Sequence, residues 1–309
     1  MGYAEIERRL GAGGVVILDG GTGTELELRG VPMDAEAWCG VASLEHLETL
    51  EAVHRDYIAA GADIVTANTY ASSRLMLEPA GLGDRVAEIN RAAIAAAKRA
   101  AGARDGIAVA GSLSHMIPMA GGTAAPDLAR APGPEEREAA FRELTALHRA
   151  EGCDLILLEM MYDPERMPAA FAAATATGLP VWAGFSARRG ADGAVLSFAP
   201  HLDIPFREVV AVLADFEVQA AGIMHTPSDV VGDALDILRE VFDGPMTAYP
   251  DSGYFKMPKW QFEAIISPAE LVGFAEGWIA QGAQAVGGCC GLSPHHIAAL
   301  AALKREAAA

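Results

Sequence analysis

Two adjacent cysteines and one histidine carry the most informative chemistry in this sequence. Cys289 and Cys290 stand in the stretch Val-Gly-Gly-Cys-Cys-Gly, where the glycines allow a tight turn and a close approach to another group. Two thiolates and one imidazole form a zinc site with an open fourth position, which is typical of catalytic zinc. His225 follows the end of a predicted strand, from which its side chain can reach the same space, so we expect these three residues to bind zinc (Zn2+).

The cysteines also allow interpretations without a metal. Buried structural cysteines beside an unrelated loop histidine would give the same pattern, and so would a vicinal disulfide, which a reducing cytosol disfavours. The other two cysteines, Cys39 and Cys153, lie in a predicted loop and at a helix-to-strand junction, where we expect them to pack as ordinary buried side chains. Four cysteines in 309 residues are too few for a disulfide scaffold.

Short apolar runs alternate with longer amphipathic runs along the whole chain. The predicted strands cover residues 15–18, 62–67, 107–110, 154–159, 180–185, 218–224, 245–249 and 283–287. The predicted helices cover residues 43–60, 84–101, 134–150, 164–177, 207–215, 228–242, 267–281 and 294–304. Such alternation predicts an α/β fold with a parallel sheet covered by helices, and eight units predict a (β/α)8 TIM barrel. No low-complexity linker divides the chain, so we expect a single domain over residues 1–309.

The barrel hypothesis gathers the reactive side chains at one end of the molecule, because TIM-barrel active sites form at the carboxyl ends of the strands. The residues at these predicted ends are Asp19, Asn68, Ser112, Glu159, Ser186, His225, Tyr249, Cys289 and Cys290. Two carboxylates, an amide, a histidine and two thiols are therefore expected on one rim. The longest predicted loops, 112–133, 186–204 and 250–266, follow strands at the same rim and are expected to cover a pocket there.

Several stretches resemble the homocysteine S-methyltransferase family, the zinc-dependent thiol methyltransferases that include betaine– and S-methylmethionine–homocysteine methyltransferases. The stretches are LDGGTGTEL from Leu18, HRDYIAAGADIVTANTY from His54, AGSL from Ala110, DLILLE from Asp154, YPDSG from Tyr249 and GGCCG from Gly287. The resemblance covers nearly the whole chain. It implies methyl transfer to a zinc-bound thiolate, with homocysteine as the default acceptor and methionine as the product.

The resemblance also implies roles for single residues. Cys289 and Cys290 would be two of the three zinc ligands of the family. Asp19 and Glu159 would be the catalytic carboxylates and, with Gly20, would hold the amino group of the acceptor. The rest of the predicted substrate-binding set is Asn68, Tyr70, Tyr249 and Asp251.

The chain departs from the family pattern where the third ligand is expected. The family has Gly-x-Asn-Cys at that strand end, whereas this chain has Met224 and His225 in the last two positions. Asp251 stands where the family usually has asparagine. Zinc with three thiolates carries a net charge of −1, and zinc with two thiolates and a neutral imidazole carries 0. We therefore expect a less electron-rich metal that acidifies the thiol more strongly, and a different small thiol stays open as acceptor.

The expected partners are a small-molecule thiol and a cationic methyl donor, a sulfonium or quaternary ammonium compound. Aromatic rings attract such cations by about 0.5–2 kcal/mol each. The aromatic residues in the strand-end loops are Tyr70, Tyr162, Tyr249, Tyr254, Phe255 and Trp260, although packing explains any one of them equally well. Two other function classes stay open: a zinc-assisted hydrolase or lyase with Glu159 or Asp251 as general base, and a non-catalytic binding protein.

Composition constrains the remaining partners. The chain has 23 Lys and Arg against 41 Asp and Glu, a net charge of −18, which repels phosphate backbones, so nucleic acid is not expected. No stretch approaches 18 uncharged apolar residues, so no membrane span is expected. The charged N-terminal stretch does not resemble a signal peptide, and a cytoplasmic enzyme is expected. The oligomeric state stays open, with a homo-oligomer among the alternatives.

Overall fold

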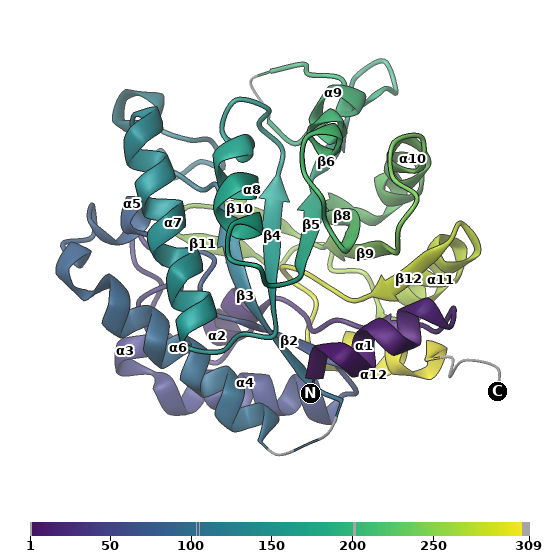
Figure 1. Ribbon diagram of the computed structural model, residues 1–309, viewed down its shortest axis with the longest axis horizontal. Coiled ribbons are helices and arrows are strands. Elements are labelled where there is room, and N and C mark those ends of the chain that lie inside the picture. Colours follow the sequence, from purple (N-terminus) through teal and green to yellow (C-terminus); the bar gives the residue numbers. More distant parts are fainter. Residues whose placement is uncertain (1, 103, 105, 200–201, 305–309) are drawn as a thin grey trace.

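Eight parallel strands form a barrel in the computed structural model, which describes residues 2–102, 104, 106–199 and 202–304 (Figure 1). The strands are β1 (Val16–Ile17), β2 (Ile64–Ala67), β3 (Ala108–Ser114), β4 (Leu155–Met161), β5 (Val181–Phe185), β8 (Ala220–Pro227), β9 (Met246–Asp251) and β12 (Ala283–Val286). Their order in the sheet is β1-β12-β9-β8-β5-β4-β3-β2. A parallel bridge between Leu18 and Ile64 brings the two edges together. The predicted (β/α)8 barrel is confirmed.

Helices surround the sheet on its outer face (Figure 1). They are α1 (Gly2–Gly11), α2 (Thr22–Leu28), α3 (Ala42–Glu45), α4 (Leu47–Ala59), α5 (Arg74–Leu77), α6 (Val86–Ala101), α7 (Pro134–Ala150), α8 (Met167–Thr175), α9 (Phe206–Val210), α10 (Ser228–Arg239), α11 (Pro268–Ala280) and α12 (Pro294–Leu300). None of the helices in these described ranges is both long and apolar enough to cross a membrane.

The element boundaries differ from the predicted ones in several places. The predicted helix 43–60 is interrupted at His46, whose backbone leaves the helical region, and the predicted helix 207–215 changes to a 3-10 helix after Val210. The strand predicted at 107–110 extends to Ser114. The helix α1 was not predicted, and residue 1 before it lies outside the described residues.

Two of the loops predicted to cover the pocket contain antiparallel hairpins. The first pairs β6 (Ala187–Arg189) with β7 (Val195–Ser197), and the second pairs β10 (Tyr254–Lys256) with β11 (Lys259–Gln261). A hairpin satisfies its own backbone hydrogen bonds, so it can stand above the barrel without a further sheet. Both loops therefore contain regular secondary structure at the rim of the barrel.

The barrel interior is filled by alternate residues of its strands, since successive side chains of a strand point to opposite faces. One buried cluster joins inward-facing residues of every barrel strand, among them Leu18, Ile64, Leu157 and Ala285. Helix α1 contributes Ile6 to this cluster and so closes the end of the barrel away from the site. A larger cluster of buried side chains packs between the sheet and the outer helices. The interior is thus a packed core that supports the rim from below.

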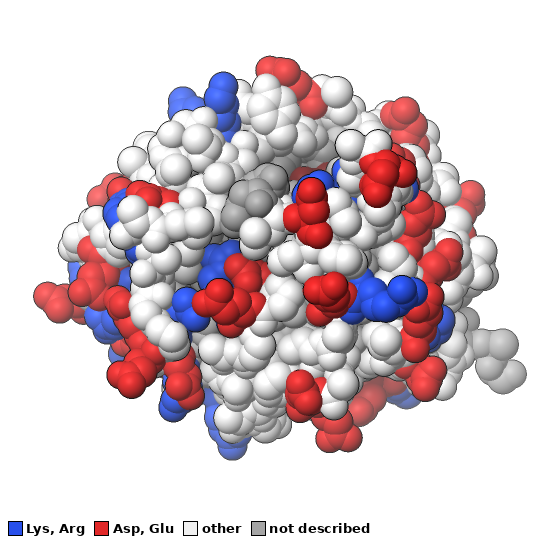
Figure 2. All heavy atoms as spheres, turned by 90° about the horizontal axis from the view of Figure 1, so that it is seen from above, with Lys and Arg blue, Asp and Glu red and all other residues white. Residues whose placement is uncertain are grey.

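The surface carries both signs of charge. Figure 2 shows acidic side chains spread over one face, with basic side chains mostly beside them. Ion pairs join neighbouring elements of the molecule, for example Arg207 with Glu240 at 2.7 Å and Arg189 with Asp233 at 2.7 Å. No continuous basic surface is visible on the described part of this face.

Candidate active site

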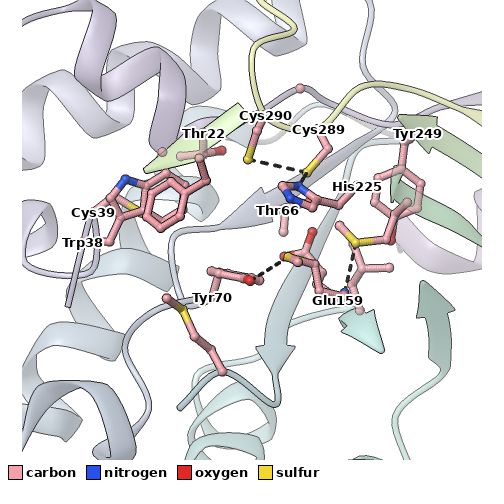
Figure 3. A pocket seen from close by; sticks show the side chains of 18 of the residues that line it. Thr22, Trp38, Cys39, Thr66, Tyr70, Glu159, His225, Tyr249, Cys289 and Cys290 are labelled. Carbon is pink, nitrogen blue, oxygen red and sulfur yellow. Dashed lines mark hydrogen bonds between the residues drawn. The ribbon is translucent and has the colours of Figure 1, made fainter. Parts of the chain in front are cut away.

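Three potential metal ligands meet above the barrel (Figure 3). The Sγ atoms of Cys289 and Cys290 are 3.8 Å apart, and Cys289 Sγ is 3.6 Å from Nδ1 of His225. The three ligand atoms all lie within 4.8 Å of one another. The structure therefore brings together the three residues that the sequence singled out, although they come from two separate strand ends.

The spacing of these donors fits a tetrahedral zinc ion. Zinc–sulfur bonds of about 2.3 Å and zinc–nitrogen bonds of about 2.0 Å at tetrahedral angles separate two sulfurs by roughly 3.8 Å and sulfur from nitrogen by roughly 3.5 Å. Two of the three separations here are 3.8 Å and 3.6 Å, and the third, between Cys290 Sγ and the imidazole, lies within 4.8 Å. Soft thiolates with an imidazole also match the ligand types that zinc prefers.

The cysteine pair is held by backbone contacts to the end of β9. The N–H of Cys289 donates to the carbonyl of Pro250 at 2.8 Å, and the N–H of Ser252 donates to the carbonyl of Cys290 at 2.9 Å. Gly291 has a φ of +80°, and a Cβ there would lie 1.9 Å from the carbonyl oxygen of Ser252. Only glycine fits this turn, so the glycines beside the cysteines allow the close approach that the sequence suggested.

His225 is aimed into the pocket by an irregularity in β8. The pairing of β8 with β9 shifts between Met224 and Pro227, and His225 has a φ of +43°, which is rare for a residue other than glycine. Such bulges turn a strand locally and re-aim a side chain. The hydroxyl of Thr226 donates to the carbonyl of Met224 at 2.8 Å and accepts from the N–H of Ala187 at 2.9 Å, which holds the distorted segment in place.

The electrostatic surroundings of His225 oppose one another. Burial lowers the pKa of the imidazole, but the nearby Asp251 carboxylate and the hydrogen-bonding contact with Cys289 Sγ outweigh it and raise the pKa to about 9. The Nε2 atom lies 3.6 Å from a carboxylate oxygen of Asp251. The hydrogen bond to Cys290 and burial together raise the pKa of the Cys289 thiol well above its usual value. A bound metal cation would act against both effects, because it favours the thiolate and the neutral imidazole.

Two carboxylates face the pocket from separate parts of the barrel wall, Asp19 after β1 and Glu159 on β4. Asp19 is buried and accepts the N–H of Thr66 at 2.7 Å and its hydroxyl at 2.9 Å. Glu159 accepts a short hydrogen bond from the hydroxyl of Ser112. Burial raises the pKa of both carboxyls to about 7, and the charge of Glu159 adds to the rise at Asp19. A cation between them would relieve both penalties, so the pair is suited to an ammonium group.

The remaining predicted binding residues occupy different places. Gly20, Asn68, Tyr70 and Tyr249 line the pocket. Asn68 is engaged with the neighbouring loop, because its amide donates to the carbonyl of Cys39 at 2.9 Å and its oxygen accepts from the Cys39 thiol at 3.3 Å. The Cys39 side chain thus packs in the pocket wall, where burial raises the pKa of its thiol well above the usual value.

Asp251 lies behind His225, and it is not among the described residues that line the pocket. Tyr254, one of the aromatic residues considered for the donor, also stays outside, with 48% of its surface exposed. Its neighbour Phe255 does line the pocket, because adjacent residues of the hairpin strand β10 point to opposite faces.

Several pocket residues carried no usable signal in the sequence. Trp38, Phe198 and Met160 line the pocket, as does Thr22, whose buried hydroxyl has no hydrogen-bond partner in the described chain. Trp38 stands in an irregular loop and Phe198 beside a hairpin, where no period or motif marks the inward direction. Only Thr22, three residues after Asp19, could have been found by following the strand-end rule a little further.

The fold and the site together define a TIM-barrel enzyme with two thiols and an imidazole, all potential metal ligands, gathered at its rim. The chain belongs to the homocysteine S-methyltransferase family, since the family model of that description matches residues 16–303. The expected S-methyltransferase class is thereby confirmed.

Similar proteins agree with this assignment. The homocysteine S-methyltransferase of Escherichia coli is 28% identical over 93% of this chain and 94% of that protein. Homocysteine S-methyltransferase 3 of Zea mays is 27% identical over 94% of this chain and 90% of that protein. Among solved structures, the metallated form of the Escherichia coli homocysteine methyltransferase MmuM has a TM-score of 0.71 at 26% identity and covers 93% of this chain and 96% of that one.

Proposed function

We propose that this chain is a zinc-dependent S-methyltransferase that moves a methyl group from a cationic sulfonium or quaternary ammonium donor to the thiol of homocysteine. His225, Cys289 and Cys290 would hold the metal, and their spacing is the observation that carries the proposal. Zinc would supply a Lewis acid there that lowers the pKa of the acceptor thiol, so that its proton is released to water at neutral pH, where the free thiol is poorly nucleophilic.

The carboxylates would position the acceptor. A thiol amino acid carries an ammonium group, and Asp19 with Glu159 offers two buried carboxyls in the same pocket, whose ionised forms a bound ammonium group would favour. Ser112 and Thr66 hold these carboxylates by hydrogen bonds, so their oxygens are oriented before the ligand arrives. Their catalytic role would therefore be alignment of the sulfur with the incoming methyl group.

The aromatic side of the pocket would hold the donor. Trp38 contacts Phe255 with ring centroids 5.5 Å apart and Tyr70 with centroids 6.2 Å apart, both edge to face. Such walls attract sulfonium and quaternary ammonium groups through cation–π interaction. They also exclude water, which strengthens the attraction between the donor cation and the acceptor thiolate. In the transfer itself, a new sulfur–carbon bond forms while the donor's bond to the methyl carbon breaks and its electron pair returns to the donor atom.

The proposal is tested by zinc analysis and by an assay against matched substrates. Purified protein should contain about one zinc per chain and should methylate homocysteine, read by mass spectrometry, with at least one donor from a panel of sulfonium and quaternary ammonium compounds. The control is the same panel with the zinc removed by a chelator, which should abolish methylation, and re-addition of zinc should restore it.

Each alternative gives a distinct result in the same assay. Methylation of another small thiol in preference to homocysteine would keep the chemistry and change the acceptor. Zinc with hydrolysis or elimination of the donor and no methylated thiol would indicate a zinc-assisted hydrolase or lyase. A chain without stoichiometric zinc and without transfer would contradict the proposal and favour a binding protein.

A further inference from the structure

The ring of His225 has two nitrogens in two different surroundings. Nδ1 faces Cys289 Sγ at 3.6 Å, on the side of the potential metal ligands. Nε2 faces the carboxylate of Asp251 at 3.6 Å, and both side chains are almost enclosed, with 7% and 10% of their surface exposed. Within the described chain, Asp251 makes no other ion pair. The histidine thus stands between the cysteine pair and one buried carboxylate.

The two neighbours of the ring, the cysteine pair and Asp251, are held by the same backbone segment at the end of β9. Asp251 ends β9 between Pro250, which accepts the N–H of Cys289, and Ser252, which donates to Cys290. The His225 ring is packed between Phe198, with ring centroids 5.1 Å apart, and Trp260, with centroids 5.7 Å apart. The ring therefore has little freedom to turn, and the backbone that carries the carboxylate is tied to the cysteine loop.

We propose that Asp251 is a positioning residue for a His225-ligated zinc site, where it holds the Nε2–H side of the ring so that Nδ1 is presented to the metal. This inference rests on the proposed function. A carboxylate on the outer nitrogen of a ligating histidine fixes its tautomer and makes the ring a better donor. His225 contributes no charge to the ligand set, and Asp251 places one negative charge directly behind it.

The decisive experiment is a comparison of Asp251 variants in two backgrounds. Zinc affinity is measured by competition with a chromophoric chelator for the wild type, Asp251→Asn and Asp251→Ala. The same Asp251 changes are then made in a His225→Cys background, where the third ligand has no outer nitrogen. We expect Asp251→Ala to weaken zinc binding by about 10- to 100-fold in the histidine background and by less than about threefold in the cysteine background.

The asparagine variant is the conservative control. Its amide oxygen can face Nε2–H as an acceptor without the charge of the carboxylate, so Asp251→Asn should keep part of the affinity that Asp251→Ala loses. Cobalt substitution gives a second readout: the d–d absorption bands should change on Asp251→Ala in the histidine background and stay the same in the cysteine background. A merely structural role would weaken binding equally in both backgrounds.

The outcomes separate this inference from the proposed function. Equal losses in the two backgrounds, or no loss in either, would overturn the role of Asp251 while leaving a zinc site in place. Loss of stoichiometric zinc in His225→Ala, together with unchanged zinc in Asp251→Ala, would support the ligand and reject the positioning residue. A wild-type chain that binds no zinc would overturn both.

Discussion

A buried histidine at the rim of the barrel and a buried histidine in the helical shell have pKa values shifted in opposite directions. His225 at the rim and His54 in α4 are both buried, but burial lowers the pKa of His54 to about 4, whereas the negative groups around His225 raise its pKa to about 9. In the described chain, neither ring nitrogen of His54 has a hydrogen-bond partner. The difference shows that burial alone keeps a histidine neutral, whereas negative groups beside a buried histidine favour its protonated form and make it able to bind or exchange charge.

The largest effect is expected from removing the rim histidine. His225→Ala should weaken zinc binding by more than about 100-fold, because loss of an outer partner alone already costs about 10- to 100-fold. Metal analysis after dialysis against a chelator measures this. The matched control is His54→Leu, which should retain the metal. Tight stoichiometric zinc in His225→Ala would remove His225 from the ligand set.

The next effect concerns the carboxylate pair. Glu159→Gln should raise the KM for homocysteine by about 10- to 100-fold, since a hydrogen bond to a charged group contributes about 1.5–3 kcal/mol. An acceptor thiol of similar length without an amino group should be little affected by the same change. Equal losses for both acceptors would mean that Glu159 does not bind the ammonium group.

The same carboxylate should make the protein less stable as the pH rises. Burial raises the pKa of Glu159 from 4.5 to about 7, so the folded chain holds a proton that the unfolded chain has released between these values. Its contribution is present below about pH 4.5 and is lost as the pH rises through about 7. Glu159→Gln should therefore gain stability relative to the wild type at pH 8, by up to roughly 3 kcal/mol. Urea unfolding of both proteins at pH 5 and pH 8 measures this gain. The same difference in free energy of unfolding at both pH values would contradict the prediction.

The smallest effect is expected in the helical shell and has the opposite sign. The folded pKa of His54 is depressed from 6.5 to about 4, so its contribution to stability is present above pH 6.5 and is lost as the pH falls toward 4. His54→Leu should therefore lose less stability than the wild type between pH 7.5 and pH 5.5, by about 1 kcal/mol. Unfolding curves of the wild type and His54→Leu, measured side by side at the two pH values, test this. If both proteins lose the same stability on acidification, His54 is not held neutral in the folded chain.

Much of the fold could be predicted because it depends on local patterns. Alternating apolar strands and amphipathic helices repeat along the chain, and this repetition is enough to predict a parallel barrel. The strand-end rule then found Asp19 and Glu159, because inward-facing positions alternate up the strand and become polar at the top, as in Leu155, Leu157 and Glu159.

The parts that could not be predicted depend on irregular backbone and on distant segments. The pairing shifts in β4 and β8 give Met160 and His225 positive φ values. Neither residue is a glycine, so the sequence does not indicate a positive φ at these positions. Trp38 enters the pocket from an irregular loop that has no period to read. Asp251 was predicted among the substrate-binding residues, whereas its carboxylate faces His225.

The sequence by itself determined the barrel, the end of the barrel that carries the chemistry and the types of ligand available, since these follow from periodicity and residue type. The tertiary structure alone decided that Nδ1 of His225 faces the thiols, that Asp251 stands behind the ring and that Glu159 and Asp19 share one buried pocket. The physical reason is that electrostatic interaction depends on separation in space and on burial, and residues 225, 251 and 289 become neighbours only when β8, β9 and β12 pair in the sheet.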